Sequence, residues 1–342
     1  MLHPLRGLRN ITFSAATKRW SKYPRTCSNM ASARFSEPTR PIHWILDWDG
    51  TITRRDTLDA LVSIAASAKP DSPVLAEWQR VSDAYMSDYN DAIKKLAPGG
   101  ELPKTVQDEK RLLLALSSVE QASLDRVSAS GIFAGLTRQL IEEDAKSLIK
   151  SQKVELRKEF ASFLDSAQKT RHDRLDLLSV NWSRHFIGAC LRAADNPVQK
   201  SSIYANELDG IESNLVSHGH ISPKNDAEMS IISSADKLRY LNKLRNRYSE
   251  STSGRITSST PIIYIGDSWT DIECLLEADM GICIRDEPLG SSQKKLADRL
   301  QSLGVRCPHL SEWKQANEPQ VVWARDFAEI QEWTGSYNEG IV

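Results

Sequence analysis

The seven residues DWDGTIT, at positions 47–53, decide the fold of this chain. They follow the apolar run 42–46, which predicts a buried strand that ends in a tight turn. Gly50 supplies the turn, because glycine adopts backbone angles that other residues avoid, so Asp47 and Asp49 can face one small site. Two carboxylates placed in this way suit phosphoryl transfer, in which one attacks phosphorus and the other handles the proton of the leaving group.

The composition excludes several classes of protein. The 342 residues are 40% hydrophobic and 26% charged, which fits one large globular domain or two modest ones. A net charge of −1 gives no global field for nucleic acid, and no apolar run approaches the ~18 residues of a membrane span, so we expect neither a nucleic-acid partner nor membrane insertion. The five cysteines show no CxxC spacing, which indicates reduced thiols without a disulfide framework or a zinc site.

Residues 1–40 form a basic leader. Seven Lys or Arg residues precede the first acid, Glu37, and small hydroxyl residues are frequent among them. This composition is typical of a mitochondrial presequence, and a disordered basic tail is the alternative. Met30 opens a second stretch that would serve as an alternative start for a cytoplasmic form. We therefore expect a mitochondrial location, with a cytoplasmic one as the alternative.

Helical periodicity marks an insertion directly after the first motif. Apolar residues recur at helical spacing from position 57 to position 170, beginning with Leu58, Leu61, Val62 and Ala65. No strand signal interrupts this stretch. The pattern predicts a helical unit at 57–170 between two parts of one core, residues 41–56 and 171–342.

Polar residues follow the apolar runs of the second part. The run 175–180 reaches Ser179 and precedes a helical pattern, so Ser179 is a candidate phosphate-binding hydroxyl at a helix start. Ser183 is the alternative, since it suits a helix N-cap equally well. The next expected strand, 203–208, contains Asn206. Lys237 lies in the first turn of another helix, where the helix dipole disfavours a cation, so it is either solvated or directed at an anion.

A second strong signal is PIIYIGDSWTD, at positions 261–271. It predicts a strand that ends at Gly266 and Asp267, with Asp271 four residues later. Carboxylate oxygens are the ligands that Mg²⁺ prefers, so this stretch predicts a magnesium site. Further strands are expected at 278–284 and around 303–310. The spacing of Trp323, Phe327 and Ile330 predicts a terminal helix.

Four motifs in this chain resemble those of the haloacid dehalogenase (HAD) superfamily of phosphatases, and they occur in family order over residues 42–310. In chain order they are the stretch 47–53, the strand end at Ser179, the helix start at Lys237 and the stretch 261–271. The resemblance is greatest to the phosphoserine-phosphatase-like branch, whose members place a helical cap after the first motif. The run YIGDSWTDIECLLEADMGI, at 264–282, is also similar to the HAD domain of plant mitochondrial thiamine-monophosphate phosphatases and to fungal relatives. Helical caps exclude water and read the substrate.

This resemblance implies an α/β fold, a doubly wound parallel sheet with a HAD-like Rossmannoid core, an inserted helical cap, and a site at the carboxyl ends of the strands. It implies that Asp47 is the nucleophile and that Asp49 is the general acid and base. The residues expected to bind phosphate or substrate are Thr51, Ser179, Lys237, Gly266 and, near the substrate, Asn206. The expected Mg²⁺ ligands are Asp47, the Asp49 backbone carbonyl and Asp267, with Asp271 in support.

The function expected from these residues is Mg²⁺-dependent hydrolysis of a small phosphorylated metabolite through an aspartyl-phosphate. A phosphotransferase or mutase would share every motif, and a non-catalytic scaffold would keep only the fold. A dehalogenase would need neither the acid Asp49 nor the metal residue Asp267, so both residues argue against it. The sequence leaves the oligomeric state and the identity of the substrate open.

Overall fold

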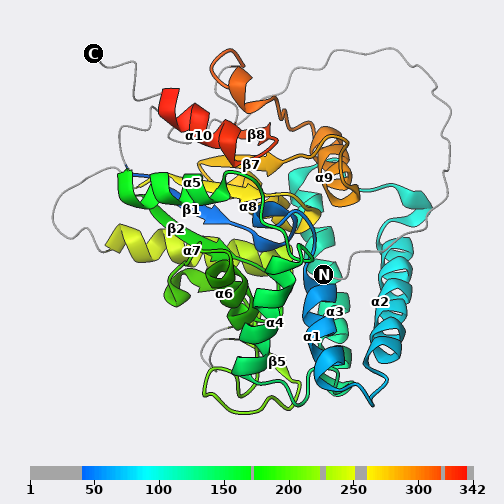
Figure 1. The fold of residues 1–342 in the computed structure, drawn as a ribbon. Helices are drawn as coiled ribbons and strands as arrows, with labels where there is room; N and C mark the ends of the chain where they lie inside the picture. The colour runs from blue at the N-terminus through cyan, green and yellow to red at the C-terminus, as the bar shows by residue number, and fades with distance from the viewer. Residues whose placement is uncertain (1–40, 171–172, 224–228, 251–259, 317–319, 337–342) are drawn as a thin grey trace.

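The computed structural model describes the chain over residues 41–170, 173–223, 229–250, 260–316 and 320–336 (Figure 1). The predicted leader, with the alternative start at Met30, lies outside these ranges. Within them, no helix combines the length and the hydrophobicity that crossing a bilayer requires.

Six parallel strands form the central sheet, in the order β3-β2-β1-β6-β7-β8. Strand β1 pairs with β2 on one side and with β6 on the other, so the strand order reverses at β1. Ligands of open α/β sheets bind at such a reversal, beyond the carboxyl ends of the strands. The predicted α/β doubly wound sheet is confirmed. Its strands are β1 (His43–Leu46), β2 (Arg174–Leu178), β3 (Ile203–Tyr204), β6 (Ile262–Gly266), β7 (Met280–Ile284) and β8 (Val321–Ala324).

Helices cover both faces of this sheet (Figure 1). Trp44 and Leu46 point into one hydrophobic core and Ile45 into the other, as expected for a parallel strand buried on both faces. The first core contains side chains of α5 (Phe160–Asp165), α6 (Arg184–Ala193) and α10 (Phe327–Ser336). The second contains side chains of α7 (Ser234–Glu250), α8 (Ile272–Glu277) and α9 (Ser291–Ser302).

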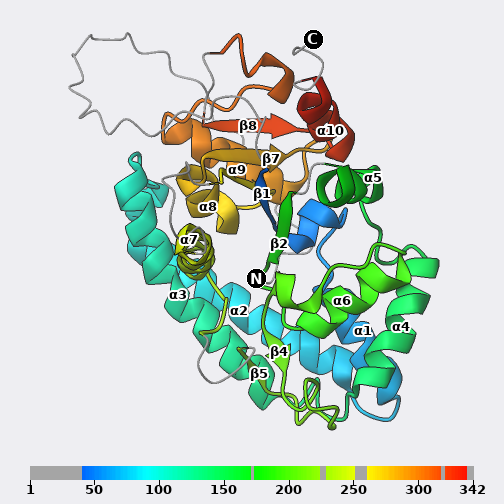
Figure 2. The same ribbon diagram turned by 90° about the vertical axis from the view of Figure 1, so that its left-hand side faces the viewer.

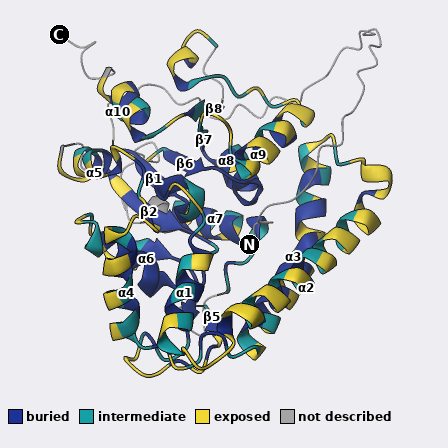
Figure 3. Cartoon of the chain, turned by 45° about the vertical axis from the view of Figure 1, so that its right-hand side comes forward, coloured by how far each residue is buried: buried dark blue, intermediate teal, exposed yellow. Residues whose placement is uncertain are grey.

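The first four helices of the insertion are α1 (Leu58–Ala68), α2 (Val74–Leu96), α3 (Val106–Ala129) and α4 (Arg138–Lys150). They lie below the sheet in Figures 1 and 2, where α4 packs on α6 and α3 packs on α7. Thr105 and Thr137 begin α3 and α4 by accepting backbone hydrogen bonds at their N-caps. Figure 3 shows exposed residues along the outer faces of α2 and α3. Helix α5 instead packs on α10, where the rings of Phe160 and Phe327 lie 5.2 Å apart.

Two predicted elements differ from the structure. The strand expected at 203–208 is divided: β3 joins the central sheet, whereas β4 (Glu207–Leu208) pairs antiparallel with β5 (Ile221–Ser222). The prediction of a strand around 303–310 is wrong. His309 forms only an isolated bridge with Trp323, and the last strand among the described residues is β8, which contains Trp323. The terminal helix therefore begins later than predicted, at Phe327, after Asp326 accepts a hydrogen bond from the Ala328 backbone at 3.0 Å.

Candidate active site

The turn at 47–53 brings β1 to the centre of a polar site. The Asp47 backbone N–H continues the ladder by donating to the Ile265 carbonyl of β6 at 2.9 Å. Gly50 then has a φ of +75°, and a Cβ atom at that position would lie 2.4 Å from Asp267 Oδ2. Only glycine fits both the backbone angle and the space. The predicted turn therefore brings the first motif against the fourth.

The ammonium group of Lys237 lies between the carboxylates of Asp47 and Asp271. Its Nζ lies 2.8 Å from Asp47 Oδ1 and 2.7 Å from Asp271 Oδ1, and its side chain has no exposed surface. Burial lowers the pKa of this ammonium, but the Asp271 and Asp47 carboxylates outweigh burial and raise it. Lys237 is therefore a fixed positive charge that faces two acids.

Both oxygens of the Asp271 carboxylate accept hydrogen bonds from other groups of the protein. Its Oδ1 accepts from the Tyr264 hydroxyl at 2.6 Å, and its Oδ2 accepts from the Ser268 backbone and hydroxyl at 3.0 and 2.9 Å. A Cβ atom on Gly266 would lie 2.5 Å from its Cγ, so glycine at the end of β6 leaves room for this acid. Asp271 therefore fixes Lys237 and the turn after β6.

Asp267 faces the first motif from the end of β6. Its Oδ1 accepts from the Thr51 hydroxyl at 3.2 Å, and its Oδ2 accepts from the Ser292 hydroxyl at 2.9 Å. Burial, and then the charge of Asp271, raise the pKa of Asp267 to about 7. Thr51, Asp267 and the Asp47–Lys237 pair therefore belong to one buried cluster.

Asp49 has different partners from Asp47. Its Oδ1 accepts from the Thr57 backbone and hydroxyl at 2.8 and 2.6 Å, and its Oδ2 accepts from Asn181 Nδ2 at 2.9 Å. Burial raises the pKa of Asp49, although the hydrogen bonds from Asn181 and Thr57 lower it in part. A carboxyl group with a raised pKa is suited to proton transfer near neutral pH.

The loop after β2 separates the two candidate serines. Ser179 is completely buried at the strand end, and its Oγ accepts from the Asn181 backbone at 3.1 Å. Ser183 caps α6 by accepting from the Phe186 backbone at 3.1 Å, and it donates to Glu207 Oε1 at 2.8 Å. The hydroxyl of Ser183 is therefore occupied by structural bonds, whereas Ser179 lies two residues from the Asn181 that holds Asp49. The direct contact of Ser179 with phosphate stays a prediction.

Asn206 holds two loops together. Its amide nitrogen donates to the carbonyls of Asn181 and Ile231 at 3.2 and 2.8 Å, and its amide oxygen accepts from the Ile231 backbone at 2.9 Å. These bonds use both ends of a completely buried side chain. The geometry supports a positioning role for Asn206 and shows no end of the amide free for a substrate.

Two residues of the site were missed by sequence reasoning. Asn181 lies in the same loop as Ser179, and the only sequence signal for it is that position. Arg157 lies between α4 and α5, donates to the Gly50 carbonyl at 2.8 Å and forms a two-point pair with Asp286. No motif spacing points to Arg157, because more than a hundred residues separate it from each partner in either direction.

The acidic cluster suits a hard divalent cation. One oxygen each from Asp47, Asp267 and Asp271 lies within 4.8 Å of the others, and all three residues are buried. Asp47 Oδ1 is buried and has no hydrogen bond within the described residues beyond its ion pair with Lys237. Burial and the neighbouring charge of Asp271 raise the pKa of Asp47 well above its ordinary value, which indicates excess negative charge. An all-oxygen donor set of this kind fits Mg²⁺.

Comparisons with known proteins identify relatives in fungi and plants. No family model matches the chain. The chain is 28% identical over 248 residues to a CTO1 family protein of Schizosaccharomyces pombe. The matched region covers 71% of this chain and 81% of that protein. It is 28% identical over 256 residues to the mitochondrial bifunctional TH2 protein of Arabidopsis thaliana. That matched region covers 70% of this chain and 38% of the plant protein. The predicted resemblance to plant and fungal proteins is confirmed.

One solved structure to which the chain is similar is described as a phospho-aspartyl intermediate analogue of phosphoserine phosphatase. The TM-score is 0.45 at 14% sequence identity, and the match covers 86% of this chain and 99% of that chain.

Proposed function

We propose that this chain is a Mg²⁺-dependent phosphatase that hydrolyses a small phosphomonoester through an aspartyl-phosphate on Asp47. One observation carries the proposal: a single turn presents two carboxylates with different partners. Asp47 faces the ammonium of Lys237 at 2.8 Å, whereas Asp49 accepts hydrogen bonds from Thr57 and Asn181. A pair of acids held in different environments is suited to separate roles as nucleophile and proton donor.

The first step transfers the phosphoryl group to the protein. A carboxylate oxygen of Asp47 forms a bond to phosphorus while the bond from phosphorus to the leaving oxygen breaks. Asp49 gives its proton to that oxygen, so the leaving group departs as a neutral alcohol. Lys237 offsets the charge that gathers on the phosphoryl oxygens, with Thr51 and Ser179 as expected hydroxyl donors. Mg²⁺, when held by Asp47 and Asp267, would supply further positive charge to those oxygens.

The second step returns Asp47 to its starting state. Asp49, now a carboxylate, accepts a proton from a water molecule as the water oxygen bonds to phosphorus. The bond from phosphorus to Asp47 breaks, and inorganic phosphate leaves. Asp49 ends protonated and ready for another cycle, so one residue serves both steps. Its three hydrogen bonds keep the carboxyl group in one orientation throughout.

Phosphate release from the purified full-length chain tests the proposal. We expect release from p-nitrophenyl phosphate and from members of a panel of phosphorylated metabolites, with loss of activity in EDTA and recovery with Mg²⁺. Asp47→Asn should abolish the activity, whereas Asp71→Asn, on an exposed loop, should keep it. Turnover by Asp47→Asn, or turnover that survives complete Mg²⁺ removal, would contradict the mechanism.

Product analysis in the same assay separates hydrolysis from transfer. A phosphatase acting in water releases one inorganic phosphate for each ester consumed, and an added alcohol captures at most a part of the phosphoryl groups. A phosphotransferase or mutase would instead place the phosphoryl group on the added acceptor or on another position of the substrate. A non-catalytic scaffold would consume no ester at all.

We also propose a mitochondrial location, on the basis of the seven basic residues that precede the first acid in the leader. Residues 1–40 fused to a fluorescent reporter should direct it to mitochondria. The same fusion with the seven Lys and Arg residues that precede Glu37 changed to Gln is the control. A uniformly cytoplasmic reporter from the unchanged leader would refute the proposal and favour a start at Met30.

A further inference from the structure

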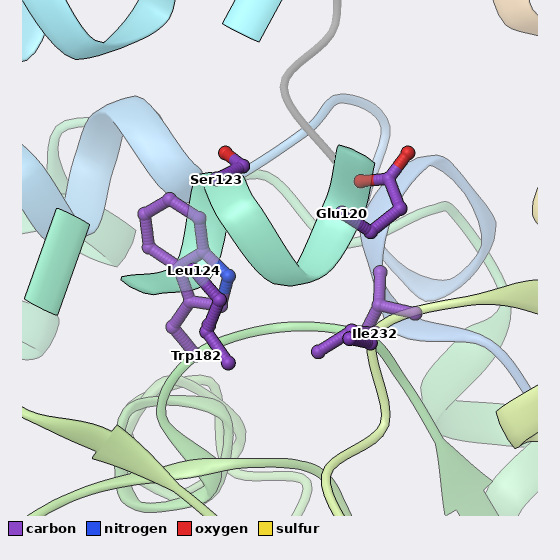
Figure 4. Close-up of a pocket in the computed structure, with 6 residues that line it drawn as sticks. Glu120, Ser123, Leu124, Trp182 and Ile232 are labelled. Atoms are coloured by element: carbon purple, nitrogen blue, oxygen red, sulfur yellow. The ribbon is translucent and has the colours of Figure 1, made fainter. Parts of the chain in front are cut away.

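A pair of cysteines lies outside the residues that the proposed phosphatase uses. Cys283 is in β7, and Cys307 is in the loop that follows α9. Both side chains belong to the second hydrophobic core, where Cys283 is completely buried and Cys307 is partly exposed. The small cavity in Figure 4 is a separate feature, because the six residues that line it include no cysteine. Any reactivity of the pair therefore comes from the two sulfur atoms and their own neighbours.

One residue of β8 holds both cysteines in place. Trp323 is the partner of Cys283 in the parallel ladder between β7 and β8. The backbone N–H of Trp323 also donates to the carbonyl of Pro308 at 2.9 Å, and Pro308 is the residue after Cys307. The loop that carries Cys307 is therefore fixed beside the strand position that faces Cys283.

The two thiol groups are in direct contact. The Cys283 S–H group donates a hydrogen bond to the sulfur of Cys307. This bond favours the thiolate of Cys307, so it lowers the pKa of Cys307 and raises the pKa of Cys283 well above its ordinary value. Hydrogen-bonded sulfur atoms need only a short approach to reach the bonding distance of a disulfide.

A guanidinium group faces the same sulfur. Arg285 Nη2 donates to Cys307 Sγ at 3.2 Å, and the guanidinium carbon lies 5.5 Å from the ring centre of Trp323. Among the described residues, Arg285 forms no ion pair with a carboxylate, so its charge acts on the sulfur without a competing anion. That charge adds to the hydrogen bond from Cys283 in lowering the pKa of Cys307, whereas burial opposes both effects. A partly exposed thiol beside a cation and a second thiol has the environment of a reactive cysteine.

The other cysteines of the described residues have a different environment. Cys190 in α6 and Cys274 in α8 are buried, and burial raises the pKa of both thiols. A buried thiol with a raised pKa is a poor nucleophile, because the thiolate is the reactive form. Cys190 and Cys274 are therefore internal references for the reactivity of Cys307.

We propose that Cys307 and Cys283 form a peroxide-sensing dithiol, in which Cys307 reacts first and Cys283 then closes a reversible disulfide. In the first step the Cys307 thiolate attacks one oxygen of hydrogen peroxide, the O–O bond breaks and hydroxide leaves. Two electrons pass from sulfur to peroxide, and Cys307 becomes a sulfenic acid. Arg285 favours this step, because its positive charge stabilises both the thiolate and the departing hydroxide.

The second step forms the disulfide. The sulfur of Cys283 bonds to the sulfur of Cys307 while the S–O bond of the sulfenic acid breaks. The departing hydroxyl group takes the proton of the Cys283 thiol and leaves as water. A thiol reductant returns both cysteines to their starting state by thiol–disulfide exchange.

Peptide mapping of the full-length chain tests the pair. The reduced protein, freed of reductant, is treated with a small molar excess of hydrogen peroxide, blocked with N-ethylmaleimide as it is unfolded, and cleaved without reduction. Cleavage after Lys, Arg and Glu is needed, because Glu277 then separates Cys274 from Cys283. We expect a disulfide between the peptides of Cys283 and Cys307 that disappears with dithiothreitol, while Cys190 and Cys274 carry the maleimide.

Substitutions separate the roles of the two cysteines. Cys283→Ser removes the resolving thiol, so the sulfenic acid should persist on Cys307 and be trapped there by dimedone. Cys307→Ser should leave Cys283 unoxidised at the same peroxide concentration. Cys27→Ser, in the leader, should form the same disulfide as the wild type.

The guanidinium has its own matched pair of variants. Arg285→Gln should slow the reaction with peroxide roughly threefold or more at neutral pH, because the thiolate fraction falls faster with rising pKa than the nucleophilicity of the thiolate increases. Arg306→Gln, at an exposed position beside Cys307, should keep the wild-type rate. Equal rates for Arg285→Gln and the wild type would refute the part assigned to Arg285.

Three results would overturn the proposal. They are a disulfide that joins other cysteines or two copies of the chain, a dimedone adduct on Cys283 in place of Cys307, and oxidation of Cys190 or Cys274 before Cys307. The mapping of the wild-type protein does not depend on the folding of any variant, and thermal unfolding checks the fold of each substitution. None of these measurements uses phosphate release, so they test the dithiol whether or not the chain is a phosphatase.

Discussion

Lys237 Nζ lies 2.8 Å from Asp47 Oδ1, and neither side chain is more than 5% exposed. The same ammonium lies 2.7 Å from Asp271, so one cation is shared by two acids. Burial of a charge is costly unless the charge is paired, which makes each member of this group dependent on the others. The arrangement links the stability of the core to the residues proposed for catalysis.

Replacing Lys237 with Met should therefore affect stability as well as activity. The change leaves buried carboxylates without their cation, and breaking such a pair costs ~3–5 kcal/mol of unfolding free energy. We expect urea denaturation without Mg²⁺ to show a loss of this size, and added Mg²⁺ to restore part of it. Lys243→Met, an exposed position on the same helix, should change the unfolding free energy by less than ~0.5 kcal/mol. Equal stability of Lys237→Met and wild type would show that the buried pair is not held as described.

The hydrogen bond from Asn181 to Asp49 predicts a change in the pH profile. This bond favours the ionised carboxyl group and so lowers the pKa of Asp49, against the rise that burial causes. The first step needs Asp49 protonated, so activity on alkyl phosphates should fall as the pH rises through that pKa. Asn181→Ala removes the bond and should move this alkaline decline to higher pH. Asn90→Ala, exposed on α2, is the control. If the alkaline decline of the variant occurred at the same pH as in the wild type, Asn181 would not influence the pKa of the proton donor.

The sequence predicts the centre of the site because the two strongest motifs follow neighbouring strands. Strands β1 and β6 are adjacent and parallel, so Asp47 and Asp267 meet at one edge of the sheet. The apolar runs before both motifs are short, uninterrupted and bounded by glycine turns, so the two strands can be predicted from the sequence. Lys237 could be placed with them only through the resemblance to the phosphatase motifs, because a cation in the first turn of a helix is by itself either solvated or directed at an anion.

The rest of the site depends on tertiary contacts that have no local pattern. Asn181 looks like an ordinary loop residue, and its role comes only from the distance to Asp49 in the folded chain. Arg157 donates to the Gly50 carbonyl across a sequence separation of 107 residues. At the carboxyl end, Trp323 keeps helical spacing with Phe327 and Ile330 although it lies in β8. The residue that marks the boundary between β8 and α10 is Asp326, which caps the helix.

A buried ion pair joins the insertion to the core, and its variants should show how much it contributes to the unfolding free energy. Glu109 of α3 pairs with Arg299 of α9, and Arg299 Nε donates to Glu109 Oε1 at 3.0 Å. Glu109→Met leaves the guanidinium buried without its carboxylate and should cost ~3–5 kcal/mol of unfolding free energy. The double variant Glu109→Met and Arg299→Met should lose clearly less than the sum of the single losses. Additive losses in urea denaturation would show that the two side chains act independently.

The last prediction concerns Asp49, because its proton separates two classes of leaving group. An alkoxide has a high pKa and needs a proton in the transition state, whereas an activated phenolate leaves without one. Asp49→Asn keeps the size of the side chain and one acceptor oxygen for Thr57 but removes the acid. Loss of general acid catalysis should lower the rate on alkyl phosphates by ~10²–10⁴, with a smaller loss in the first step on an aryl phosphate.

The same variant should also stop after the first step. Hydrolysis of the aspartyl-phosphate needs Asp49 as a base, so Asp49→Asn should accumulate phosphorylated protein during turnover of p-nitrophenyl phosphate. Mass spectrometry of acid-quenched samples would detect the added phosphoryl group and assign it to the peptide that contains Asp47. Asp47→Asn should show no labelling under the same conditions, and Asp71→Asn should turn over like the wild type, because Asp71 is exposed. Equal rate losses on alkyl and aryl esters, without a phosphorylated intermediate, would remove Asp49 from both proton transfers.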